Sequence, residues 1–502
     1  MLYRELVESH REDERIVLHV DNVGLSYQQI DCLVMNALIN MEKEGLLRGD
    51  RVLIVGSNNL ETVLLILACI AGGYVFVPID AGISIEKYRM IIQNCMPKVI
   101  YIASEEAVRE SVPGIRMITV SRIKGEYFKF DKKEKDREKR LEIDADGMAY
   151  ILYTSGSTSE PKGVVACYRQ VIFCIEAINR VLENGKDDRI LSVLPVAFDY
   201  GLYQIFLALS SGAVLYLKDH YMVQELPGEL MRLGISGFPG LPSMFRLLIR
   251  TRLFERMESP ALRYITSTGE VFSERLIRQL ERIFPTVHIL PMYGLTECKR
   301  VSMMPLNKET QQLKKGSCGV PLSGIRVWLR DKDENTGIGE LVVSGPNVME
   351  GYWNDKAETE RYFVLSKEQD SNTLYTGDLF SIDSDGFLYF KGRKKRILKV
   401  RGHRISCSEI EAFAEEIEGV EECVVFGYLS KNDEEKAGIC AVSDNVKSGN
   451  RKMADVIRHE VEVQYPMLKG FSLWMRTESL PRNIHGKIDV IRVQRECEDY
   501  GK

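Results

Sequence analysis

Residues 149–163 read AYILYTSGSTSEPKG, an apolar run that gives way to hydroxyl-bearing residues and glycine and ends in Pro-Lys-Gly. This composition predicts a buried strand that leads into a loop. Gly156 lets the backbone of such a loop curve tightly. The stretch is not the GxxxxGK[ST] motif of P-loop ATPases, because Gly163 rather than serine or threonine follows Lys162.

The predicted loop carries the groups that bind phosphate. Serine and threonine hydroxyls, turn-like backbone N–H groups and a lysine ammonium together form a cradle for phosphate oxygens. A single short motif leaves an ordinary Ser/Thr-rich turn open as the alternative. The residues predicted to line the cradle are Thr154, Ser155, Gly156, Ser157, Thr158 and Lys162.

Five further segments follow in order: YGLTE from Tyr293, GELVVSGPNVMEGYW from Gly339, YTGDL from Tyr375, GRKKRILKVRGHRISCSEIE from Gly392 and HGKID from His485. Together with residues 149–163 they resemble the AMP-forming adenylating enzymes. That superfamily contains acyl-CoA synthetases, adenylation domains of nonribosomal peptide synthetases and luciferases. Six ordered motifs across nearly the whole chain are far more specific than any one of them. One departure is Ser159, where the family usually has glycine and a side chain restricts the backbone.

Strands alternate with helices in the first part of the chain. Residues 51–56 predict a buried strand, residues 59–71 a helix and residues 74–80 another strand. Such alternation predicts an α/β fold, with mostly parallel sheets flanked by helices.

The length of 502 residues fits two to four domains of about 150 residues each. The resemblance implies a large N-terminal AMP-binding domain at residues 1–393. It also implies a small, mobile α+β domain at residues 394–502, with a hinge near Lys395.

Two pairs of residues fit helix-capping boxes, in which a side chain and a backbone N–H bond reciprocally. They are Ser26 with Gln29, and Ser408 with Glu411. Each pair precedes apolar residues at helical spacing, so each predicts the start of an amphipathic helix.

Composition excludes several kinds of protein. The net charge of −5 gives no reason to expect nucleic acid or an anionic membrane surface as a partner. The 11 cysteines are odd in number and scattered, which favours reduced thiols in a cytoplasmic protein. The N-terminal segment is too charged for a signal peptide, and the longest apolar run is shorter than the ~20 residues that span a bilayer.

The chemistry that the resemblance implies joins a carboxylate to the α-phosphate of ATP. Two anions must meet, so cations and hydrogen-bond donors should converge on them. By resemblance, the loop of residues 154–158 and Lys162 hold the β- and γ-phosphates. Glu297 matches the Mg²⁺ ligand and Thr296 contacts the α-phosphate; a carboxylate is the hard oxygen ligand that Mg²⁺ prefers.

The nucleoside has its own matching residues. Tyr293 matches the ring that stacks on adenine, beside Gly269, Glu270 and Gly294. Asp378 matches the carboxylate that accepts both ribose hydroxyls, with Arg393 nearby. A turn cap after Gly377 is the alternative for Asp378 when it is taken alone.

Lys487 matches the lysine that contacts the substrate carboxylate and the bridging phosphate oxygen. Such a lysine orients both reactants and screens their charge. In the second half-reaction the family's small domain rotates about the hinge and brings in the segment around Gly402, which lines the thiol channel.

The acid should bind at the carboxyl ends of parallel strands. Asp199 matches the aspartate that pairs with the substrate ammonium in amino-acid-activating relatives. A partly buried carboxylate without a cation is costly, which favours a small amino acid. The alternative is that Asp199 caps a helix. The predicted pocket residues are Phe198, Asp199, Tyr200, Tyr203, Pro239, Thr266, Thr268, Met292, Arg300 and Val301.

The sequence therefore predicts an ATP- and Mg²⁺-dependent ligase that adenylates an acid and passes it to the phosphopantetheine thiol of a carrier protein. An acyl-CoA ligase, which uses free coenzyme A, is the first alternative. A non-catalytic nucleotide-binding homologue is the second, and an oxidative, luciferase-like activity is the third.

Overall fold

The structure is a computed structural model that describes residues 1–104, 107, 112–124, 143–154, 160–254, 261–365, 371–400, 403–429, 435–443, 446–482 and 487–500. Two segments that carry predictions lie outside these residues. They are residues 155–159 of the phosphate loop, which include Ser159, and Gly402 of the thiol channel.

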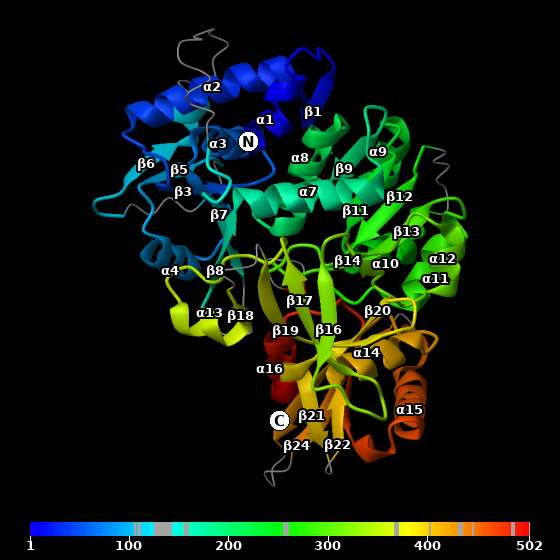
Figure 1. Ribbon diagram of the computed structural model, residues 1–502. Helices are drawn as coiled ribbons and strands as arrows, with labels where there is room; N and C mark the ends of the chain where they lie inside the picture. Colours follow the sequence, from blue (N-terminus) through cyan, green and yellow to red (C-terminus); the bar gives the residue numbers. More distant parts are fainter. Residues whose placement is uncertain are drawn as a thin grey trace.

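The first sheet has six strands in the order β6-β5-β3-β4-β7-β8, all parallel except the β7–β8 pair. Its strands are nearly continuous apolar runs because both faces are covered. Helices α2, α3 and α4 belong to this part (Figure 1). The bounds are β3 Arg51–Gly56, β4 Val75–Asp80, β5 Val99–Ile102, β6 Arg116–Thr119, β7 Met148–Thr154, β8 Lys162–Cys167, α2 Tyr27–Lys43, α3 Leu60–Gly72, α4 Ile85–Cys95 and α5 Val120–Arg122.

The second sheet has nine strands in the order β15-β14-β13-β12-β11-β9-β10-β1-β2, and its six central strands are parallel. The strands are β1 Ile16–Val20, β2 Val23–Ser26, β9 Arg189–Ser192, β10 Val214–Leu217, β11 Gly237–Gly240, β12 Tyr264–Ser267, β13 His288–Tyr293, β14 Ser302–Met303 and β15 Val320–Pro321. The predicted α/β fold with mostly parallel sheets is confirmed.

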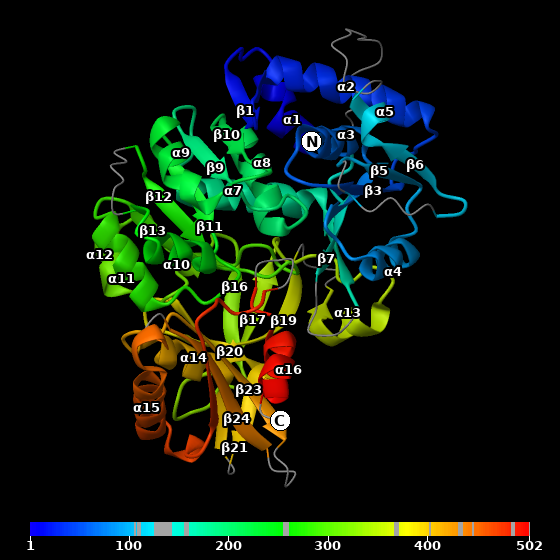
Figure 2. The same ribbon diagram turned by 180° about the vertical axis from the view of Figure 1, so that it is seen from behind.

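Helices α7 and α8 lie between the two sheets, and one apolar core joins them (Figures 1 and 2). Helices α10 and α11 pack together on the outer side of the second sheet. The helices of this part are α1 Leu2–Leu6, η1 Glu8–His10, α7 Tyr168–Leu182, α8 Asp199–Ser211, η3 Val223–Glu225, α9 Leu226–Arg232, α10 Pro242–Arg250, α11 Glu274–Ile283 and α12 Lys308–Leu313.

A third sheet is wholly antiparallel and connects the large sheets to the C-terminal part. Its elements are β16 Arg326–Arg330, β17 Gly339–Gly345, β18 Phe363–Val364, β19 Asn372–Ile382, β20 Leu388–Arg393 and the adjoining helix α13 Lys356–Tyr362. Strand β19 runs on through Asp378, so the turn-cap interpretation of Asp378 is wrong.

The C-terminal part has its own apolar core around a three-stranded sheet and a two-stranded ribbon. Figure 2 shows α14 and α15 on one side of this sheet and α16 on the other. The elements are η5 Lys394–Arg396, β21 Ile397–Val400, β22 His403–Ser406, α14 Cys407–Glu416, β23 Glu422–Leu429, β24 Glu435–Val442, α15 Val446–Gln464, η6 Pro466–Leu468, β25 Ser472–Arg476 and α16 Val490–Tyr500.

The two capping-box predictions have opposite outcomes. Ser26 and Gln29 form the reciprocal box at the start of α2, as predicted. The box at Ser408 is wrong, because α14 begins at Cys407 with Ser406 as its N-cap. Glu411 is instead used in packing: its carboxylate accepts hydrogen bonds from Arg396 and from the backbone N–H of Val425.

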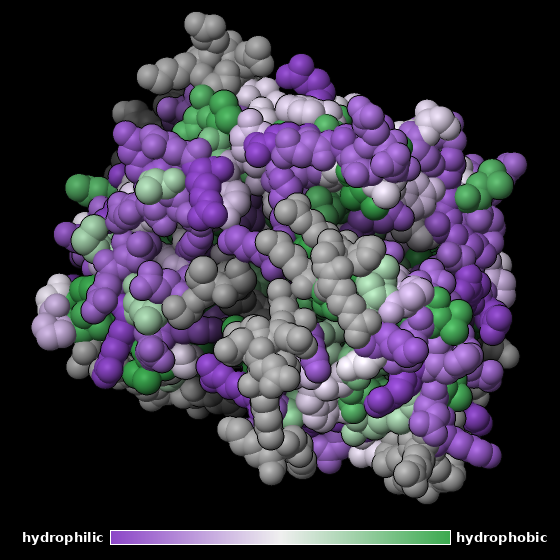
Figure 3. All heavy atoms as spheres, turned by 90° about the horizontal axis from the view of Figure 1, so that it is seen from below, coloured by the Kyte–Doolittle hydropathy of each residue, from purple (hydrophilic) through white to green (hydrophobic). Residues whose placement is uncertain are grey.

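The described part of the chain holds no helix that is both long and apolar enough to cross a bilayer. The face seen from below agrees: where residues are coloured, it is mainly hydrophilic, and apolar side chains form small separate patches (Figure 3).

The first turn of α8 is pressed against the loop that precedes it. A Cβ added to Gly201 would lie 2.2 Å from Pro195 O and 2.6 Å from Leu194 O, which are backbone atoms. A glycine is therefore needed at this position for the helix to place Asp199 and Tyr200 where they lie.

We predict that Gly201→Ala lowers the free energy of unfolding by about 1–3 kcal/mol, the usual size of an overpacking effect. The matched control is Gly228→Ala in α9, where an added Cβ meets no atom within 4 Å. That change should be neutral or stabilise by about 0.4–1 kcal/mol. Urea unfolding measures the stability of both variants, provided that the dependence of the unfolding free energy on urea concentration is unchanged. Equal midpoint urea concentrations for the two variants would contradict the prediction.

Candidate active site

Asp199 and Lys299 form an ion pair beside the predicted acid pocket. The Lys299 ammonium donates to the backbone oxygen of Asp199 at 2.7 Å and lies 3.4 Å from its Oδ2. Its side chain is 1 % exposed and lies 4.0 Å above the ring centre of Tyr203. The chain itself therefore supplies a cation for Asp199, and the argument that this carboxylate needs one from the substrate is wrong.

The helix-cap interpretation of Asp199 is also wrong. Asp199 is the first residue of α8, and Phe198 occupies the N-cap position. An acidic side chain in the first turn of a helix is still favoured by the helix dipole.

Burial and charge act against each other in this pair. Burial opposes ionisation of Asp199, but the Lys299 ammonium and the Arg300 guanidinium outweigh it and hold the pKa of Asp199 below its usual value. Burial lowers the pKa of Lys299 to about 8, against the attraction of Asp199. Opposite charges thus keep both groups ionised in a buried place.

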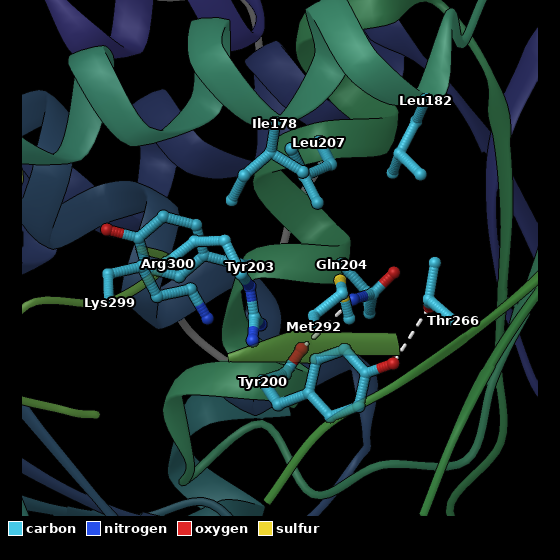
Figure 4. A pocket seen from close by; sticks show the side chains of 10 residues that line it. All are labelled: Ile178, Leu182, Tyr200, Tyr203, Gln204, Leu207, Thr266, Met292, Lys299 and Arg300. Atoms are coloured by element: carbon cyan, nitrogen blue, oxygen red, sulfur yellow. Dashed lines mark hydrogen bonds between the residues drawn. The ribbon is translucent and has the colours of Figure 1, made fainter. Parts of the chain in front are cut away.

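A pocket opens beside this pair (Figure 4), with an empty volume of about 250 Å³ that includes its open mouth. Five of the predicted residues line it: Tyr200, Tyr203, Thr266, Met292 and Arg300. Sequence reasoning missed five others: Ile178, Leu182, Gln204, Leu207 and Lys299. The signal for Lys299 was its position next to Arg300, whereas Ile178 and Leu182 lie on α7, which carries none of the predicted site residues.

Four predicted pocket residues do not line this space. Phe198 is the N-cap of α8, and Pro239 lies in β11 opposite Thr266. Thr268 follows β12, and Val301 is fully buried. They support the pocket from behind or lie at its edge.

The predicted nucleoside residues meet around Asp378, which is 2 % exposed. Tyr293 OH donates to Asp378 Oδ2 at 2.9 Å, and Arg393 Nε lies 3.1 Å from Oδ1. Burial raises the pKa of Asp378, while Arg393 and Tyr293 oppose the shift. The Tyr293 ring also packs edge-on against Phe380.

Gly294 and Gly269 allow close approach at the ends of β13 and β12. A Cβ on Gly294 would lie 1.8 Å from Lys299 O, so only glycine fits there. Gly269 has a φ of 91°, and an added Cβ would lie 3.8 Å from Lys487 Cε. These glycines bring the pocket, the nucleoside residues and Lys487 together.

Lys487 belongs to the C-terminal part and lies beside Gly269, at the end of β12 in the large part. Its position beside Gly269 puts its ammonium in the field of Asp199, Glu270 and Asp378. The surrounding protein desolvates the ammonium and lowers the pKa of Lys487, Arg393 adds to this shift, and the three carboxylates oppose it. The residue nevertheless remains open to solvent.

Arg482 ties the segment before Lys487 to the large part of the chain. One guanidinium nitrogen lies 2.9 Å from Glu270 Oε1, and the other pairs with Glu422. Glu270 is held from its other side by Arg246, at 3.2 Å.

Two arginines on α11 contact the end of α14. Arg275 Nη1 donates to the carbonyl oxygens of Glu415, Ile417 and Val420, and Arg278 pairs with Glu416 at 2.9 Å. Glu415 is in the last turn of α14, where carbonyl oxygens have no partner within the helix.

Lys162, at the end of the phosphate loop, pairs with Glu358 of α13. It lies 5.3 Å from the ring centre of Tyr352 and 5.9 Å from that of Tyr362. The predicted hinge residue, Lys395, lies 5.8 Å from the same Tyr362 ring. The phosphate-loop lysine and the hinge therefore share neighbours on one helix.

Glu297, the predicted metal ligand, accepts a hydrogen bond from Tyr352 OH at 2.8 Å, and Thr296 precedes it. Within the described ranges, no three or more histidine, cysteine, aspartate or glutamate side chains gather closely enough to hold a metal. Mg²⁺ commonly binds through one or two carboxylates, with phosphate and water as its other ligands. The single carboxylate of Glu297 is compatible with this mode of binding.

Comparison with known proteins identifies the family. The profile described as "AMP-binding enzyme" matches residues 5–353. The chain belongs to this family. The predicted class, an AMP-forming acid–thiol ligase, is confirmed.

Curated relatives match along nearly the whole chain. D-alanine–D-alanyl carrier protein ligase from Staphylococcus epidermidis is 26 % identical over 493 residues, which are 95 % of each protein. Bacitracin synthase 1 from Bacillus licheniformis is 25 % identical over 96 % of the chain, but the match spans only 9 % of that much longer protein.

A solved structure of VinN in complex with L-aspartate is also similar. It is 28 % identical, with a TM-score of 0.69, and the match covers 78 % of the chain and 98 % of VinN.

We predict that Arg482→Ala slows acyl-adenylate formation by about 10- to 100-fold, the effect of losing charge-assisted hydrogen bonds that position the Lys487 segment. Thioester formation from a supplied adenylate should stay within about threefold of the original rate. Single-turnover assays of each half-reaction measure both.

The matched control is Arg492→Ala, which removes an ion pair with Glu496 on the exposed surface of α16. Such pairs contribute little, so neither half-reaction should change. Equal slowing of both half-reactions by Arg482→Ala would contradict its role in positioning Lys487.

Proposed function

We propose that this chain adenylates a small amino acid with ATP and then transfers the aminoacyl group to the phosphopantetheine thiol of a carrier protein. One observation carries the proposal: Lys487 lies beside Gly269, next to Glu270, and its ammonium interacts electrostatically with Asp199, Glu270 and Asp378. A single cation is thus within reach of the acid pocket on one side and of the nucleoside residues on the other.

In the first half-reaction a carboxylate oxygen attacks the α-phosphorus of ATP, and the bond to pyrophosphate breaks. Lys487 screens the repulsion between the two anions and holds both in the orientation for attack. Lys162 and the loop at residues 154–158 hold the β- and γ-phosphates, and Thr296 contacts the α-phosphate. Asp378 accepts the ribose hydroxyls beside Arg393.

A bound Mg²⁺ ion would neutralise phosphate charge during this step. Glu297 is the residue that would hold it, with the phosphates and water as the other ligands.

In the second half-reaction the thiol sulfur attacks the acyl carbon, and AMP leaves with the electron pair of the broken bond. The small domain, residues 394–502, turns about Lys395 so that Lys487 leaves the cleft and the segment at Gly402 reaches it. The contacts of Arg275 and Arg278 with α14, and the ion pair of Arg482 with Glu270, must break for this turn. A different set of residues thus serves each of the two half-reactions.

The carrier protein is favoured over free coenzyme A because a relative that matches 95 % of the chain, and is itself matched over 95 % of its length, is a carrier-protein ligase. The amino acid is favoured because relatives act on D-alanine or bind L-aspartate. A pocket that Tyr200 and Tyr203 narrow also disfavours a long fatty chain. Free coenzyme A remains the alternative acceptor. An assay of thioester formation with coenzyme A and with the carrier protein distinguishes the two acceptors.

We predict that Lys487→Ala lowers the rate of acyl-adenylate formation by about 10²- to 10³-fold, the loss that follows removal of a group that stabilises transition-state charge. Thioester formation from a supplied adenylate should largely survive, since Lys487 is outside the cleft at that stage. Pyrophosphate exchange reports the first half-reaction, and thioester yield reports the second.

Lys356→Ala is the control, because that lysine is 89 % exposed and its ion pair is with another exposed surface residue, Glu360, at 67 %. It should leave both rates unchanged. A comparable loss of both half-reactions in Lys487→Ala would contradict the proposal that each half-reaction uses its own domain arrangement.

A further inference from the structure

The polar side chains of the pocket, one excepted, already have partners. Tyr200 OH and Thr266 Oγ1 bond to each other at 2.8 Å, and Gln204 Nε2 donates to the backbone oxygen of Tyr200 at 3.1 Å. Tyr203 OH lies 3.3 Å from Tyr150 OH. Figure 4 shows the first two of these bonds as dashed lines.

Arg300 is the exception. The residue is 3 % exposed, and its buried Nε has no hydrogen-bond partner. Among the described residues no carboxylate lies within ion-pairing distance of its guanidinium, which instead lies 5.4 Å from the ring centre of Tyr200. A buried cation without an anion is strongly unfavourable, so the arrangement calls for a negative group from outside the chain.

The charge of the surroundings points the same way. Asp199 is the carboxylate that acts on Arg300 electrostatically, and the Lys299 ammonium already pairs with it. Two buried cations thus share one carboxylate. Burial lowers the pKa of Arg300, and the charge of Asp199 opposes that shift.

The position of Arg300 fits the far end of a bound acid. Asp199 interacts electrostatically with Lys487, Lys299 and Arg300, so the adenylation lysine and the two pocket cations act on one carboxylate. Arg300 lines the pocket, whereas Lys487 lies beside Gly269 at the end of β12. An acid whose reacting carboxylate meets Lys487 and whose chain enters the pocket would therefore bring its far end to Arg300.

We infer that the acid carries a second anionic group, most simply a second carboxylate, and that Arg300 is the specificity-determining residue that binds it. Arg300 presents a planar fork of donors that matches a carboxylate with two parallel hydrogen bonds. The inference rests on the proposed function for the identity of the reacting carboxylate. It does not require an amino group, since both an amino dicarboxylic acid and a simple dicarboxylic acid supply the second anion.

The test compares acids that differ only in this charge. Aspartate is paired with asparagine, and succinate with succinamate, so that a neutral amide replaces one carboxylate at almost constant shape. Pyrophosphate exchange should favour each diacid over its amide by about 10-fold or more, the effect of one charge-assisted interaction. Exchange with both diacids would show that the site does not require an amino group. Exchange with aspartate alone would show that it does.

Arg300→Gln should bring the ratio of diacid to amide close to one, and Arg300→Lys should keep part of it. Urea midpoints of both variants show whether each has folded. If Arg300→Gln does not fold, the preference of the unaltered protein and the Arg300→Lys variant still decide the matter. Equal exchange with diacid and amide in the unaltered protein would overturn the inference, and so would an unchanged preference in a folded Arg300→Gln.

Thermal stabilisation by succinate and by succinamate, without ATP, separates this inference from the proposed function. Binding that favours succinate and depends on Arg300, with no exchange for any acid, would overturn the ligase and retain the anion site. Exchange with acids that carry no second charge, together with equal binding of succinate and succinamate, would overturn the anion site and retain the ligase.

Discussion

The ammonium of Lys487 and the carboxylates around it are the interaction on which the site depends. Lys487 comes from the C-terminal part of the chain, whereas the three carboxylates belong to the large part: Asp199 begins α8, Glu270 follows β12 and Asp378 lies within β19. The site exists only while the two parts are docked. Arg482, Arg275 and Arg278 hold that docked state through ion pairs and through carbonyls at the end of α14. Because these contacts are largely polar, they can break and re-form at a lower energetic cost than an apolar interface.

The pocket floor shows how burial and charge together define specificity. Asp199 and Lys299 neutralise each other, so the pair contributes a polar, fixed wall rather than an open charge. Arg300, beside the Tyr200 ring, shares the charge of Asp199 with Lys299, and its Nε has no hydrogen-bond partner. The chain thus appears in this region as a receptor for negative charge, with Lys487 at one end and Arg300 at the other.

Much of the fold was predictable because the local signals are strong. The buried strand and helix at residues 51–71, and the capping box of Ser26 and Gln29, have the pattern that the structure adopts. The second capping box failed for a tertiary reason. Glu411 has the right spacing, but Arg396 and the backbone of Val425 bind its carboxylate, and no local pattern reveals those distant partners.

For the site, too, the sequence indicated some features and not others. Motifs located Asp378 and Lys487, and the structure places both in the cleft. The partner of Asp199 could not be foreseen, because Lys299 lies one hundred residues later in the sequence and meets Asp199 only in the folded chain. Sequence spacing gave the residue types, whereas the pairing of charges required the three-dimensional arrangement.

A structure of the chain bound to a hydrolysis-resistant analogue of succinyl adenylate tests this account most directly. The account predicts the ribose hydroxyls on Asp378, the Lys487 ammonium within hydrogen-bonding distance of the acyl or phosphate-mimicking oxygens, and the free carboxylate on Arg300. A free carboxylate pointing to solvent, with Arg300 still unpaired, would contradict it, as would a nucleoside bound away from Asp378.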